Sequence, residues 1–132
     1  MNEDIEPITR IEIINQAKDK LKVLEVYRFD EFKNIQKAFK DFFSIDFELD
    51  HAQALLDREN QGSHHPDNIQ LLLKYHNGKK SNKSWERFNF EKQETYIRDV
   101  IKLQSNVADN FEIELNNEIL TQLLNRLKII YN

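Results

Sequence analysis

Apolar residues recur at three- and four-residue steps in four stretches of the chain, which is the pattern of amphipathic helices that pack on a core. These stretches cover residues 8–24, 32–43, 90–107 and 116–131. The first predicts a helix that begins near Pro7, because proline suits the first helical position. The second is rich in phenylalanine, which we expect to lie in the core, and Asp30 is its expected N-cap.

A different pattern separates the second helical stretch from the third. The segment IDFEL, residues 45–49, alternates between apolar and polar positions and is too short for a helix, so it predicts a strand. After a polar excursion, IQLLL at residues 69–73 predicts the returning strand of a hairpin, and residues 74–85 predict a short helix. The sequence therefore predicts an α+β fold that is mostly helical.

The length of 132 residues suits a single domain with its own core. We expect three parts within it: N-terminal helices in residues 1–44, a hairpin-and-helix core in 45–87 and C-terminal helices in 88–132. Apolar residues at 39% and charged residues at 32% are typical of a globular protein. No apolar run resembles a signal peptide or a membrane span, so we expect a cytoplasmic location and no membrane partner.

Charge is spread unevenly along the chain. Against a formal net charge of −4, one short segment holds five basic side chains, namely Lys74, Lys79, Lys80, Lys83 and Arg87. This segment predicts a local basic surface that could hold phosphates while the rest of the protein stays acidic. The alternative is a solvated lysine-rich turn without a partner.

Polar residues whose side chains can bind a metal or transfer a proton lie at the ends of the predicted hairpin. Asp50 and His51 follow the first strand, Asn68 opens the second, and His76 and Asn77 come just after it. A carboxylate with an amide or imidazole can bind a divalent cation, and a nearby histidine can take a proton from water. Together these groups predict metal-assisted phosphodiester hydrolysis. Taken one at a time, the same residues are also typical of turns and strand ends.

Three short motifs occur in order between residues 49 and 83: LDH, HPDNIQLL and HNGKKSNK. In this order they resemble the HNH nuclease family of His-Me finger enzymes, whose core is a ββα-metal hairpin and helix. The resemblance implies that His51 is the general base and Asp50 a metal ligand. It also implies that Asn68 fixes the hairpin loop and orients His51. The resemblance does not extend to the flanking helices.

The chain departs from the common family pattern at a cysteine pair that brackets the start of the helix. Those cysteine positions fall on Leu73 and His76, and the chain has no cysteine, so it cannot hold the family's structural zinc. The resemblance then makes Asn77 the second metal ligand, with His76 as the rival. The implied cofactor is one divalent ion, with Mg²⁺ preferred and Mn²⁺ or another transition metal as alternatives.

The function implied is an HNH-type endonuclease that hydrolyses DNA, either a restriction or defence nuclease or the catalytic module of one. The expected phosphate contacts are made by basic residues of the third motif and just after it: Lys79, Lys80, Lys83 and Arg87. An RNA substrate, a homodimer and a larger restriction-type assembly remain open. The alternative is a non-catalytic nucleic-acid-binding or protein-interaction domain with the same fold. We expect His64 and His65 to be a surface pair in the loop.

Overall fold

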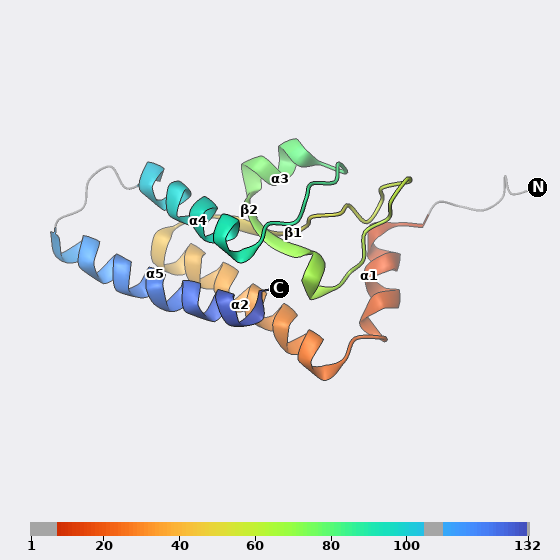
Figure 1. Ribbon diagram of the computed structural model, residues 1–132, viewed down its shortest axis with the longest axis horizontal. Helices are drawn as coiled ribbons and strands as arrows, with labels where there is room; N and C mark the ends of the chain where they lie inside the picture. The colour runs from red at the N-terminus through yellow and green to blue at the C-terminus, as the bar shows by residue number, and fades with distance from the viewer. Residues whose placement is uncertain (1–7, 105–109, 132) are drawn as a thin grey trace, which may run out of the picture.

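The computed structural model describes residues 8–104 and 110–131 and has the expected mostly helical α+β fold (Figure 1). Two helices, α1 (Arg10–Lys18) and α2 (Val23–Phe43), come before the hairpin of β1 (Phe47–His51) and β2 (Ile69–Leu73). The 3-10 turn η1 (Pro66–Asn68) leads into β2, and α3 (Lys74–Lys80) follows it directly. The chain then forms α4 (Phe90–Gln104) and α5 (Asn110–Ile130). No helix in these residues is long and apolar enough to cross a membrane.

The core forms where α2 and α5 lie side by side, with the hairpin and α4 closing over them (Figure 1). Most of the phenylalanine-rich stripe of α2 is buried there, as predicted: Phe32 and Phe39 have no exposed surface. The prediction is wrong for Phe42, which is 59% exposed near the end of the helix. From α5, Leu127 and Ile130 meet this stripe and are equally buried. The apolar stripe of the last helix is therefore used within the chain's own core.

The single helix expected over residues 8–24 is two helices with a turn between them. Helix α1 ends at Lys18, and the N–H groups of Lys20 and Leu21 turn back to carbonyls of its last turn. Helix α2 then begins, because the carboxylate of Glu25 accepts the backbone N–H of Lys22 at 2.9 Å. Asp30 therefore lies inside α2 and is not an N-cap. The predicted start near Pro7 lies outside the described residues.

The two strands pair antiparallel, and Asp50 lies opposite Gln70 and His51 opposite Ile69. Strand β2 has the predicted bounds, but β1 begins and ends two residues later than predicted. As a result Asp50 and His51 belong to the strand itself. Their side chains leave opposite faces of the hairpin, because neighbouring strand residues alternate.

The remaining predicted helices differ from the structure mainly at their ends. Helix α3 stops at Lys80, short of the predicted residue 85, where Ser81 takes a left-handed φ of 50°. The predicted end of the third stretch, at Val107, lies outside the described residues. Helix α5 begins earlier than predicted, at Asn110. Helix α4 docks on β2 through Gln93, whose buried amide bonds both the N–H and the carbonyl of Leu71.

Candidate active site at the hairpin and α3

A polar cavity of about 250 Å³ lies beside β1 and α3. Its wall comes from α1, β1, the segment after β1, and α3, and includes Arg10, Asp50, His51, Asn77 and Lys80. The predicted hairpin and short helix were expected to bring Asp50, His51, Asn68 and either His76 or Asn77 together. Asp50, His51 and Asn77 line this one cavity, whereas Asn68 and His76 are not part of its wall.

The Asp50 carboxylate is buried, with 5% of its surface exposed. Its Oδ2 accepts a hydrogen bond from Gln70 Nε2 at 3.0 Å, and its Oδ1 lies 3.2 Å from the Lys80 ammonium. Burial raises the pKa of Asp50, while the partners Gln70 and Lys80 oppose that rise. The residue is thus a buried carboxyl group with both oxygens already engaged inside the protein.

The imidazole of His51 is also buried, with 8% of its surface exposed. Its Nε2 lies 2.9 Å from Nδ1 of His64, and its Nδ1 is buried without a hydrogen-bond partner. Burial, with smaller contributions from the nearby His64, Arg10 and Lys80, lowers the pKa of His51 to about 3. His51 is therefore neutral at pH 7, the form that can accept a proton.

Asn68 ties together the two ends of the long loop between the strands. Its Oδ1 accepts the N–H of Gln53 at 2.8 Å, and its Nδ2 donates to the carbonyls of Gln53 and Ser63. The loop also closes at Gly62, where an added Cβ would lie 1.8 Å from the Gln53 oxygen, so no side chain fits. Asn68 thus fixes the backbone just after His51 without touching the imidazole.

Asn77 and His76 face different surroundings. Asn77 lines the cavity that also holds Asp50, and its Nδ2 donates to Glu48 Oε1 at 3.1 Å. His76 Nδ1 lies 2.7 Å from the Tyr96 hydroxyl, next to α4 and away from the cavity wall. Of the two rival ligands, the one that shares a cavity with Asp50 is Asn77.

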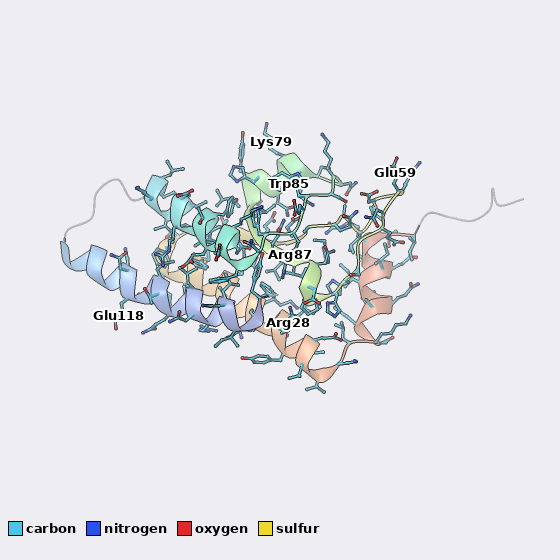
Figure 2. All side chains as sticks on the ribbon, in the orientation of Figure 1. Arg28, Glu59, Lys79, Trp85, Arg87 and Glu118 are labelled. Atoms are coloured by element: carbon cyan, nitrogen blue, oxygen red, sulfur yellow. The ribbon has the colours of Figure 1, made fainter. Side chains whose placement is uncertain are left out.

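The basic residues predicted to contact phosphates divide into two groups. Lys79 and Lys83 are exposed, and Figure 2 shows Lys79 extending outward from α3. Lys80 is 2% exposed, and its Nζ also donates to the carbonyl of His51 at 2.9 Å. Arg87 is half-buried, and its guanidinium group donates to the carbonyls of Ile69 and Pro66. The prediction of solvent-facing phosphate contacts is therefore corrected for Lys80 and Arg87, whose donors hold the fold together.

Two residues of the site were not expected from the sequence. Arg10 enters the cavity from α1, and its positive charge acts on both Asp50 and His51. Its place is set by packing across the fold, and nothing in its local sequence marks it. His64, expected at the surface, instead touches His51 and stacks on Phe29 with ring centroids 4.4 Å apart. His65 is also engaged, through Nε2 to Glu25 at 2.6 Å.

The donor groups of the cavity fit a hydrated hard cation better than a zinc ion. Within the described residues, no three His, Cys, Asp or Glu side chains gather as a metal site. Asp50 and the amide oxygen of Asn77 could supply two oxygen ligands, which would suit Mg²⁺ because that ion keeps several waters. Gln70 and Lys80 use only two of the roughly four lone-pair positions of the Asp50 carboxylate. The nearby Lys80 ammonium opposes a second cation, so weak binding is expected.

The cavity thus combines a neutral imidazole, a carboxylate, a carboxamide and two cationic side chains from separate elements of the fold. These groups suit a site that binds an anionic ester and moves a proton. Comparison of the chain with protein-family models, with curated proteins and with solved structures finds no match.

Proposed function

We propose that the chain is an HNH-type endonuclease that hydrolyses phosphodiester bonds in DNA with one divalent ion, Mg²⁺ preferred. The observation that carries the proposal is the shared cavity, whose wall includes Asp50 and His51 of β1 and Asn77 of α3. The residues of the three motifs are expected at one cavity only if the motifs form a single site. Independent turn residues have no reason to meet at one cavity.

In the proposed reaction His51 takes the proton from the water that attacks phosphorus. The bond from phosphorus to the 3′ oxygen then breaks, which leaves a 5′-phosphate and a 3′-hydroxyl, as the family resemblance implies. Asp50 and Asn77 would hold the ion, which offsets negative charge on the phosphoryl and leaving oxygens when bound. Arg10 is placed to bind phosphate oxygens through its guanidinium group.

Lys80 contributes to the proposed reaction by positioning two residues of the site. Its ammonium holds the Asp50 carboxylate and the His51 carbonyl at once, so the two neighbouring residues are fixed relative to each other. The exposed Lys79 and Lys83 are left to contact the DNA backbone outside the cavity, a positioning role that reads no sequence. Each site would cut one strand, so a double-strand break would need two copies or two successive cuts.

The first test is conversion of supercoiled plasmid to open circles by the purified chain with Mg²⁺ or Mn²⁺. Cleavage should stop when EDTA removes the metal. A wild-type chain that binds DNA but never nicks it under these conditions would reject the nuclease proposal. The same assay with a single-stranded RNA of matched sequence decides between DNA and RNA as the substrate.

Two variants test the ligand assignment in that assay. Asn77→Ala should raise the Mg²⁺ concentration needed for half-maximal nicking, because it removes an oxygen ligand. His76→Ala is the matched control on the neighbouring position, and it should leave that concentration unchanged. If His76→Ala alone shifts the metal requirement, the ligand assignment is reversed.

A second function, binding nucleic acid without cutting it, is favoured by one observation. Both oxygens of Asp50 already have partners inside the protein, and His51 Nδ1 is shielded from solvent. A domain that only binds would tolerate this closed arrangement, whereas a nuclease must admit water to His51. Gel-shift binding that is independent of Mg²⁺, together with no nicking, is the result that selects this alternative.

A further inference from the structure

The loop histidine His64 is held against the proposed base by two contacts. Its Nδ1 lies 2.9 Å from Nε2 of His51, a hydrogen-bond distance. Its ring stacks on Phe29, a buried residue of α2, with 20° between the ring planes. The loop side chain is thus fixed between a core helix and the end of β1.

The contact between the two rings allows two arrangements of the protons. In the first, His51 Nε2–H donates to the Nδ1 lone pair of His64, and His51 Nδ1 carries no proton. In the second, His64 Nδ1–H donates to His51 Nε2, and the His51 proton sits on Nδ1. That nitrogen is buried without a partner, so the second arrangement leaves a buried N–H with no acceptor. The first leaves only a lone pair at that nitrogen, with no buried N–H group that needs an acceptor.

The charge state of His64 is compatible with the first arrangement. Burial lowers the pKa of His64, and the ammonium groups of Lys18 and Lys33 lower it further. His64 is therefore neutral at pH 7, and one of its ring nitrogens is free to accept a hydrogen bond. Lys18 and Lys33 line an apolar cavity of about 460 Å³ on this side of the hairpin, to which both histidines also contribute.

We propose that His64 is a positioning residue, which accepts the Nε2–H of His51 and thereby holds the Nδ1 lone pair of His51 ready for the attacking water. The catalytic part of this role rests on the proposed nuclease function. The hydrogen bond and the tautomer that it selects do not. The family resemblance assigns no role to this residue, and the sequence alone favoured a surface position for it.

The tautomer of His51 can be read from the nitrogen chemical shifts of its imidazole in a ¹⁵N-labelled chain at pH 7.5, without metal or DNA. The wild type should show protonated Nε2 and unprotonated Nδ1. His64→Phe keeps a ring to stack on Phe29 but removes the acceptor, so His51 should show a mixture of tautomers. His64→Asn places a carboxamide oxygen near the former Nδ1 and should restore the wild-type tautomer. His65→Asn is the matched control and should change nothing at His51.

Nicking kinetics then test the catalytic part. His64→Phe should lower kcat by about 10-fold or more with little change in KM, because the base is misoriented while DNA binding is intact. His64→Asn should recover most of the loss. The proposal is overturned if wild-type His51 carries its proton on Nδ1, or if His64→Phe keeps both the tautomer and kcat. If the tautomer is as expected but the wild type cuts nothing, the nuclease function falls and the His64 assignment stands.

Discussion

The helix pair α2 and α5 and the hairpin region with α3 are both buried, but by different means. Between the helices, buried side chains are apolar, as with Phe32 against the leucines of α5. The buried polar side chains of the described residues instead belong to the hairpin or contact it, and they are Asp50, His51, Gln70, Lys80 and Gln93. The hairpin also adds apolar residues such as Phe47, Ile69 and Leu71 to the core, but it buries polar groups as well, and these must find partners.

This difference indicates where the chain accepts a free-energy cost of burial that does not serve folding. Burying an apolar side chain is favourable without further conditions, whereas burying a carboxyl group or an imidazole costs free energy unless each polar atom is matched. In the hairpin region nearly every such atom is matched, and the exception is Nδ1 of His51. The unmatched atom is the one that the proposed reaction would use.

The largest expected effect concerns acid. Folded His51 has a pKa of about 3, against an ordinary value near 6.5, so the unfolded chain binds an extra proton between these pH values. Stability from this group is therefore complete above pH 6.5 and is lost as the pH falls towards 3, by at most about 5 kcal/mol. Urea unfolding of wild type and His51→Gln at several pH values measures the difference.

Wild type and His51→Gln have the same carboxylates, so the difference between their stability curves reports on His51 alone. Wild type should lose stability more steeply than His51→Gln between pH 6.5 and 4. If the free energy of unfolding of the two proteins falls equally with pH, His51 is solvated in the folded protein. The hairpin region would then not differ from the helix pair by a buried, unmatched imidazole.

Lys80→Met should destabilise the protein by about 3 to 5 kcal/mol, because it leaves the buried Asp50 carboxylate without its ionic partner. Lys79→Met, on the exposed side of the same helix, is the matched control and should change the free energy of unfolding by about 0.5 kcal/mol or less. The double variant Lys80→Met with Asp50→Asn should recover part of the loss, since no buried charge is then unpaired. Equal effects of the two lysine substitutions would contradict the buried ion pair.

A smaller effect is expected in the helix pair. Leu127→Ala removes a fully buried side chain of α5 and should cost about 2 to 5 kcal/mol in chemical denaturation. Ile129→Ala, at a position with 78% exposure, is the control and should be close to neutral. At a temperature where both variants are folded, neither should alter nicking. A loss of nicking in folded Leu127→Ala would show that the two regions are coupled.

Parts of the fold set by local chemistry could be predicted from the sequence. The run IQLLL after a proline turn correctly predicted the bounds of β2. Asn68, just before this strand, joins the two ends of the loop through its hydrogen bond to Gln53. The two-residue shift of β1 could not be predicted, because alternation marks a strand but pairing with β2 sets its ends. The break after α1 was hidden because Leu21 and Leu24 continue the helical spacing across it.

The candidate site was predictable to a similar degree. Asp50, His51 and Asn77 line one cavity, as the motifs led us to expect, whereas Asn68 and the rival ligand His76 do not line it. The buried role of Lys80 has a signal in the sequence, since it follows Asn77 by three residues and so shares its helix face. Arg10 and His64 have no such signal, because Arg10 comes from a helix distant in sequence and the place of His64 depends on how the long loop between the strands folds.

The rate of plasmid nicking by His51→Ala, measured under single-turnover conditions with saturating Mg²⁺, tests the proposed active site most directly. The expected result is a fall of about 10²- to 10⁴-fold relative to wild type, the usual contribution of a general base. The circular dichroism spectrum and the affinity for DNA should stay the same, and His76→Ala should cut at the wild-type rate. If His51→Ala cuts DNA as fast as wild type, His51 is not the base and the proposed active site is wrong.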